Sequence, residues 1–111
     1  MSLRISAYRI MWVFTLFDLP VKDKKDRYQY SRFKKFLDKE GFDMFQFSVY
    51  IRHCPSVEAA DVYEKKVSMH LPEKGTVTTF TLTDKQFERI KHYYGQGEIP
   101  LPDTPQQLQL F

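Results

Sequence analysis

The most apolar run of this chain extends from Ile10 to Phe17 and stops at Asp18, which Leu19 and Pro20 follow. Seven of the eight residues in the run are hydrophobic, which predicts a strand buried on both faces. Burying an ionised carboxylate without a partner is costly. We therefore expect the strand to end at a surface crevice, with Asp18 at its rim. Two roles remain open for Asp18: it binds a metal ion, or it caps the next turn or pairs with a cation.

Helices and strands alternate after this first strand. Apolar residues at helical spacing predict a basic helix from Lys24 to Glu40, which Gly41 ends in a left-handed turn. Period-two alternation predicts one strand from Phe42 to Arg52. The side chains expected to pack against helices from this strand are Phe45, Phe47, Val49 and Ile51. The later elements are a helix after the N-cap Ser56, a strand over residues 76–82 and a short helix from the capping box at Thr83 to Gly95.

This order of elements predicts an α+β fold, a ferredoxin-like split βαβ sandwich with its helices on one sheet face. The chain has 111 residues, enough for one domain. We expect residues 1–95 to form that domain and residues 96–111 to form an extended, proline-containing tail. The uncovered sheet face predicts a homodimer in which two sheets pack face to face.

Positive charge is concentrated in the predicted basic helix. Eight of the 17 Lys and Arg residues lie within residues 22–39, against three acids. Such a cluster can bind a phosphate backbone without reading sequence. The alternative is a solvated helix face with internal pairs between Asp38 and Lys34 or Lys35. The predicted nucleic-acid contacts are Lys22, Lys24, Lys25, Arg27, Arg32 and Lys35.

One Asp18 carboxylate is a poor magnesium site, because Mg²⁺ takes six oxygen ligands. A two-fold axis would bring a second Asp18 alongside, and two carboxylates with several waters could hold one Mg²⁺. Polar side chains on the other face of the 42–52 strand are expected to line this crevice or to form a hydrogen-bonded dimer seam. They are Gln46, Ser48, Tyr50 and Arg52. The dispersed His53, His70 and His92, with one cysteine, match no zinc pattern.

The lone Cys54 cannot form an internal disulfide, which is typical of a reducing cytoplasm. No apolar run approaches the roughly 18 residues of a transmembrane helix. The amino terminus lacks the layout of a signal peptide. We therefore expect a cytoplasmic protein that contacts no membrane.

Taken together, these residues resemble a known family. The strand that ends at Phe17–Pro20, the basic helix after it and the segment Met44–Arg52 are similar to the small CRISPR adaptation proteins, the Cas-two family. The segment Thr83–Phe87 matches as well, so the resemblance covers about Tyr8 to Gly95. The lead and the tail are most similar to the versions that accompany the Cas-nine effector.

The resemblance implies a ferredoxin-like homodimer that sits between two dimers of the Cas-one integrase and helps to capture and insert duplex spacer DNA. It also implies Mg²⁺-dependent endonuclease activity on RNA or DNA. Asp18 matches the catalytic metal aspartate of the family. Ser48, with Arg27, Arg32 or Arg52, matches its activity-linked polar and basic positions.

Two functions from different classes are therefore open. One is a nucleic-acid-binding scaffold in an integration complex. The other is a stand-alone Mg²⁺-dependent endoribonuclease on single-stranded RNA, resembling the VapD-type toxins.

The end of the tail is apolar again at Leu108, Leu110 and Phe111. Its alternation is typical of a strand that adds to a sheet edge of the dimer mate or of the integrase. The last five residues also resemble the Gln-Leu-x-Leu-Phe peptide that binds the bacterial sliding clamp, which is the alternative partner.

Overall fold

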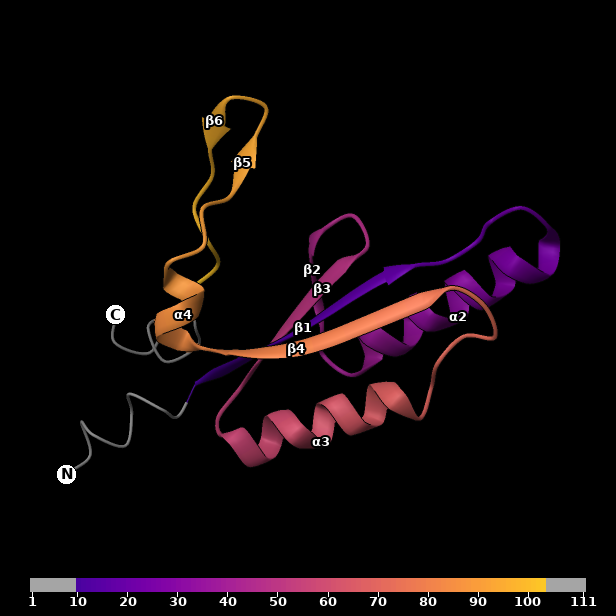
Figure 1. The fold of residues 1–111 in the computed structure, drawn as a ribbon, viewed down its shortest axis with the longest axis horizontal. Coiled ribbons are helices and arrows are strands. Elements are labelled where there is room, and N and C mark those ends of the chain that lie inside the picture. Colours follow the sequence, from indigo (N-terminus) through magenta and orange to yellow (C-terminus); the bar gives the residue numbers. More distant parts are fainter. Residues whose placement is uncertain (1–9, 104–111) are drawn as a thin grey trace.

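The computed structural model describes residues 10–103, and its main body is a four-stranded antiparallel sheet in the order β2-β3-β1-β4 (Figure 1). The elements are β1 (Met11–Asp18), α2 (Lys24–Lys39), β2 (Asp43–Gln46), β3 (Val49–Cys54), α3 (Val57–Ser68), β4 (Thr76–Thr83), α4 (Asp84–Glu88), β5 (Tyr93–Tyr94) and β6 (Gly97–Glu98). The α+β, ferredoxin-like prediction is confirmed. The expectations for Leu108, Leu110 and Phe111 concern residues outside the described part.

The apolar run forms β1, which lies at the centre of the sheet between β3 and β4. Helices α2 and α3 cover one sheet face, as predicted (Figure 1). The short α4 does not follow the expectation of helices on one face, because its Phe87 packs against the other face. The helix-side core, between the sheet and α2 and α3, contains Met11, Val13, Phe17, Phe33, Leu37, Phe42, Tyr50, Cys54, Ala60 and Val67. The open-side cluster on the other face contains Ile10, Trp12, Phe14, Ile51 and Phe87. None of the helices within residues 10–103 is long and apolar enough to cross a membrane.

The prediction of one strand from Phe42 to Arg52 is wrong. The segment is a hairpin of β2 and β3, joined by a turn at Phe47 and Ser48. The pairing register shifts between Met44 and Gln46, so that Phe45 is an extra, bulged residue. Because the bulge returns Phe45 to the face of Val49 and Ile51, the alternation continues across the turn and conceals it.

The faces of this hairpin are also the reverse of the prediction. Ile51 belongs to the open-side cluster, and Phe45 and Val49 pack against it, whereas Tyr50 lies in the helix-side core. Phe47 packs against neither face, because it sits at the turn with 77% of its surface exposed.

The helix ends follow the sequence closely. Ser56 caps α3, Thr83 and Gln86 form a capping box at α4, and Gly41 takes a left-handed φ of 84° after α2. The short helix, however, ends at Glu88 rather than at Gly95. Tyr94 belongs to β5, and Gly95, at φ 61°, lies in the turn of the β5–β6 hairpin. This hairpin crosses the predicted boundary between the domain and the tail, which lies after residue 95.

Candidate nucleic-acid and metal site

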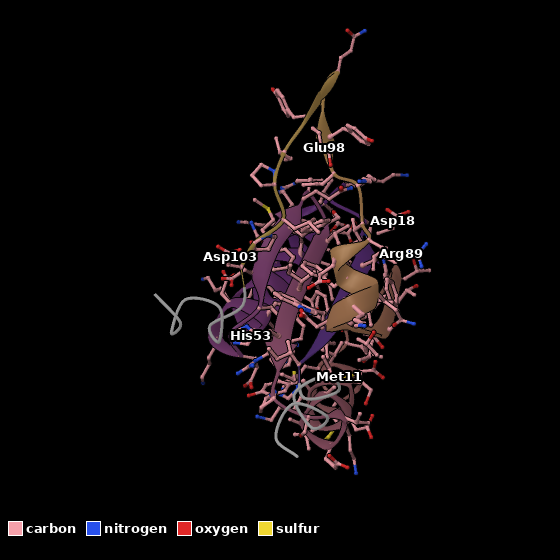
Figure 2. All side chains as sticks on the ribbon, turned by 90° about the vertical axis from the view of Figure 1, so that its left-hand side faces the viewer. Met11, Asp18, His53, Arg89, Glu98 and Asp103 are labelled. Carbon is pink, nitrogen blue, oxygen red and sulfur yellow. The ribbon has the colours of Figure 1, made fainter. Side chains whose placement is uncertain are left out.

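Asp18 is the last residue of β1 and is exposed, although the strand before it is almost entirely buried. Figure 2 shows Asp18 and Met11 at opposite ends of the molecule's central strand. Strand alternation places Asp18 on the same face as Leu16, away from α2 and α3. It pairs in register with Thr76 of β4. The carboxylate therefore stands at the rim of the sheet face that α2 and α3 leave uncovered.

An open depression of about 230 Å³ lies beside Asp18. Its lining residues are Leu16, Phe17, Asp18, Ser48, Val49, Thr76 and Thr78. The turn residue Ser48 has a left-handed φ of 66°, and its carbonyl oxygen accepts a hydrogen bond from the Phe17 N–H at 3.1 Å. This bond holds the β2–β3 turn against the end of β1. The structure thus brings Asp18 and Ser48 to one site.

Asp18 does not cap the following helix. The N-cap of α2 is Asp23, whose side chain accepts a hydrogen bond from the Asp26 N–H at 2.8 Å. Within residues 10–103 the Asp18 carboxylate takes part in no hydrogen bond or ion pair with another side chain. Of the two roles left open by the sequence, the geometry favours a carboxylate that is free to meet a ligand.

The donor set at the depression is one carboxylate with the hydroxyl-bearing Ser48, Thr76 and Thr78. In the described part of the chain no three His, Cys, Asp or Glu side chains are grouped so that they could hold a metal ion. Mg²⁺ keeps several waters and is commonly held through one or two carboxylates. One protomer therefore offers half of such a site, and the residues fit a hydrated Mg²⁺ only if a second carboxylate or a substrate phosphate joins Asp18.

The basic residues predicted to bind phosphates are all exposed along α2 and the loop before it: Lys22, Lys24, Lys25, Arg27, Arg32 and Lys35. Arg27 donates to the carbonyl oxygens of Val21 and Lys22, which ties the first turn of α2 to the loop that follows Asp18. The alternative interpretation expected ion pairs within α2 between Asp38 and Lys34 or Lys35. Among residues 10–103 neither pair forms.

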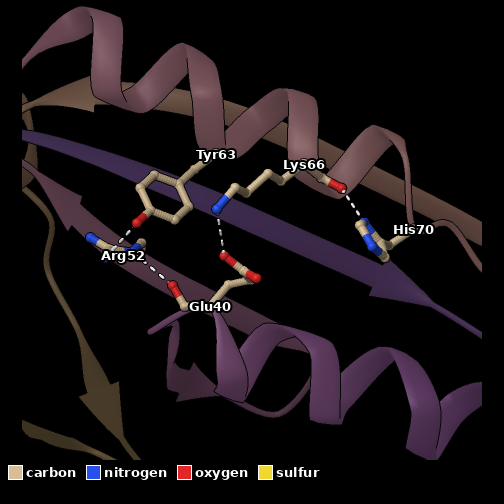
Figure 3. A network of polar contacts seen from close by, with 5 residues as sticks. All are labelled: Glu40, Arg52, Tyr63, Lys66 and His70. Atoms are coloured by element: carbon tan, nitrogen blue, oxygen red, sulfur yellow. Dashed lines mark hydrogen bonds and ion pairs between the residues drawn. The ribbon is translucent and has the colours of Figure 1, made fainter.

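Arg52 and Tyr50 do not line a crevice with Asp18, contrary to expectation. On β3 both residues point toward the helices, because the hairpin reverses the predicted faces. Arg52 Nε donates to the carbonyl oxygen of Glu40 (2.8 Å) and Nη2 to the Tyr63 hydroxyl (2.8 Å) (Figure 3). Nη1 donates to the carbonyl oxygen of His53 (2.7 Å). The guanidinium carbon also lies 3.9 Å from the centre of the Tyr63 ring. Arg52 therefore joins β3 to the end of α2 and to α3. Gln46, at the end of β2, is exposed and does not line the depression.

Sequence reasoning missed Thr76 and Thr78 of β4. The alternation of β4 would place both on one face, but the pairing of Asp18 with Thr76 is a contact between distant segments.

The side chains whose pKa values depart clearly from their ordinary values lie away from the depression. Burial lowers the pKa of His53 below 6.5, with a smaller contribution from the Arg52 charge, and burial raises the pKa values of Tyr50 and Cys54.

Comparison with known proteins connects this geometry to a family. A family model described as CRISPR associated protein Cas2 matches residues 11–90. A protein of Parvibaculum lavamentivorans is 48% identical over 101 residues, which are 91% of this chain and all of that protein. A protein of Flavobacterium psychrophilum is 43% identical over 108 residues, 97% of this chain and 94% of that one. Both are named CRISPR-associated endoribonuclease Cas2, as is a relative from Paracidovorax avenae at 40% identity over 107 residues.

The match spans every element that builds the depression, from β1 through α2 and the β2–β3 turn to β4. The chain belongs to the CRISPR-associated Cas2 family.

Proposed function

We propose that this protein acts as a homodimeric, nucleic-acid-binding subunit in CRISPR adaptation, bridging two dimers of the integrase, and that its paired Asp18 carboxylates take Mg²⁺ for phosphodiester cleavage. The observation that carries the proposal is the place of Asp18. It is an exposed carboxylate at the end of a buried strand, beside a depression that Ser48 shares.

The surroundings of Asp18 suit a phosphate substrate. The loop that leaves Asp18 leads directly into the exposed cations of α2. Lysine and arginine side chains in such an array bind a phosphate backbone irrespective of its sequence. A bound Mg²⁺ would withdraw charge from a phosphate oxygen. The cations would meanwhile hold the chain of phosphates, and the hydroxyls of Ser48 and Thr76, which line the depression, would donate hydrogen bonds to the phosphate oxygens.

The part of the open sheet face that α4 leaves uncovered supports a two-fold dimer. Leu16 and Val49 are only partly buried there. Phe80 stacks on Phe14, with the two ring centres 4.9 Å apart, and keeps 38% of its surface exposed. A second sheet packed on this face would bury these side chains. The same packing would bring two Asp18 side chains toward one axis.

The endoribonuclease names of the relatives support a second candidate, a nuclease that acts on RNA without the integrase. One set of assays separates the two. Cleavage of single-stranded RNA and of duplex DNA is measured with Mg²⁺ for the wild type and for Asp18→Asn, and spacer integration is measured with purified integrase. Loss of cleavage with full integration in Asp18→Asn would support a scaffold whose nuclease site is separate from integration.

Equal loss of cleavage and integration would tie both to Asp18. Full cleavage by Asp18→Asn, in a preparation free of contaminating nuclease, would remove Asp18 from the proposal. Analytical ultracentrifugation checks the dimer, and a monomer at assay concentrations would contradict the shared site.

A further inference from the structure

Gly75, the residue immediately before β4, lies against the backbone of Asp18. A Cβ built on Gly75 would stand 2.5 Å from the Asp18 carbonyl oxygen, 2.8 Å from Leu19 Cδ2 and 3.0 Å from Leu19 Cα. Real Cβ atoms essentially never approach other atoms closer than 3.0 Å. Two of these three neighbours are backbone atoms, which cannot turn aside as the end of a flexible side chain can.

Gly75 also has a backbone conformation that other residues rarely adopt, with a φ of 91°. Both features have the same consequence. Only glycine lets the loop of residues 69–75, between α3 and β4, pack directly on the end of β1.

The same loop is attached to the first turns of α2. Lys74 Nζ lies 3.9 Å from Oδ1 of Asp26, a carboxylate that is only 7% exposed. Lys25 Nζ lies 3.3 Å from Oε2 of Glu73. The loop therefore contacts the basic helix on one side and the Asp18 backbone on the other, and it ends where Thr76 begins to pair with Asp18.

We propose that Gly75 is a positioning residue for the Asp18 site. By allowing this close packing it fixes the backbone of Asp18, and so the place of the carboxylate that the proposed function assigns to Mg²⁺. A methyl group at position 75 must move the Asp18 carbonyl or the start of β4 by about half an ångström, from 2.5 to 3.0 Å. Misplacing a reacting group by about 1 Å can cost on the order of a hundredfold in rate. This inference rests on the proposed role of Asp18.

The test compares Gly75→Ala with Gly41→Ala. Gly41 has a similar φ of 84°, but a Cβ there meets only the guanidinium of the Arg52 side chain, at 3.2 Å and beyond, on the helix side of the sheet. Both variants carry the strain of a positive φ, and only Gly75→Ala presses on Asp18. Thermal melting is measured for each, together with the Mg²⁺ dependence of RNA cleavage.

A second readout does not depend on activity. In a ¹⁵N-labelled protein, Mn²⁺ broadens the amide signals near its binding site, and the broadening of the Asp18 and Thr76 signals is followed as Mn²⁺ is added. For Gly75→Ala we expect about tenfold more Mn²⁺ or Mg²⁺ for half of the effect, and a cleavage rate lower by about ten- to a hundredfold. Gly41→Ala is expected to melt at a lower temperature and to keep the wild-type metal response.

A wild-type metal response in folded Gly75→Ala would overturn the inference, as would an equal loss in Gly41→Ala. If Gly75→Ala does not fold, two glycines inserted between Glu73 and Lys74 release the loop without a clash, and the same weaker metal response is expected. Asp18→Asn separates the two proposals. If Asp18→Asn cleaves normally, the proposed function falls and this inference with it, whereas an inactive Asp18→Asn beside a normal Gly75→Ala removes the positioning role alone.

Discussion

Replacing Arg52 tests whether this residue stabilises the fold or belongs to the site. Its guanidinium makes three hydrogen bonds, to Glu40, His53 and Tyr63, and stacks on the Tyr63 ring. A hydrogen bond to a charged group contributes about 1.5–3 kcal/mol, and an exposed cation–π contact about 0.5–1 kcal/mol. These terms do not add fully, because the side chain is half-buried and water replaces part of what is lost.

For Arg52→Ala we therefore expect a free energy of unfolding lower by about 3 kcal/mol. At about 4 °C or more for each kcal/mol in a domain of this size, the melting temperature should fall by at least roughly 10 °C. Urea denaturation followed by circular dichroism measures the first quantity, and thermal melting the second. Cleavage and nucleic-acid binding per folded molecule, measured well below the melting temperature, should match those of the wild type.

The matched control is Arg32→Ala, since Arg32 is exposed on α2. Its stability should stay within about 0.5 kcal/mol of the wild type, while its affinity for nucleic acid falls. Arg52→Lys keeps the charge but not the planar fork, so its stability should lie between those of the wild type and Arg52→Ala. Lost cleavage with unchanged stability in Arg52→Ala would refute the reasoning and return Arg52 to the site.

Three further outcomes are expected. In fluorescence anisotropy titrations, the affinity for duplex DNA should fall steeply between about 50 and 200 mM salt, and Lys24→Ala and Lys35→Ala should each make the slope of log affinity against log salt concentration shallower by about 0.9. A slope near zero for the wild type would exclude binding through phosphates. Thr15→Val should raise the free energy of unfolding by about 1 kcal/mol in urea denaturation, because the fully buried Thr15 hydroxyl has no hydrogen-bond partner within residues 10–103. A loss of stability would show that this hydroxyl has a partner. Burial lowers the pKa of His53 in the folded protein, so as the pH falls below about 6.5 the unfolded chain binds a proton before the folded one does, and the free energy of unfolding should drop between pH 7 and pH 5. The drop should be smaller in His53→Gln, and an equal drop in both proteins would assign the pH dependence to other groups.

The position of Asp18 could be predicted because it depends on local signals. A long apolar run must be buried, a carboxylate resists burial, and Pro20 ends the strand, so the sequence around Asp18 already requires a surface position there. Helix ends are similarly local. The Thr83 capping box and the left-handed Gly41 were both evident from residues within one turn of the boundary.

The β2–β3 hairpin could not be predicted in the same way. A regular two-residue turn would have broken the alternation between Phe45 and Val49, and the bulge at Phe45 restores it. Ser48 supplies the positive φ without being a glycine, so no turn residue marked the reversal. Because the prediction missed this turn, it exchanged the two faces of β3. It therefore placed Arg52 and Tyr50 in a crevice with Asp18, whereas in the structure both point toward the helices.

The geometry of the site depends on contacts between segments that the sequence does not connect. Asp18 meets Ser48 because β1 pairs with β3, and it meets Thr76 because β1 pairs with β4. The close approach of Gly75 to the Asp18 carbonyl exists only when β4 is paired with β1, so the sequence around Gly75 does not reveal it. The carboxylate is thus specified by local sequence, whereas its surroundings are specified by strand register. A substitution in the loop of residues 69–75 can therefore alter the site without changing any residue that lines it.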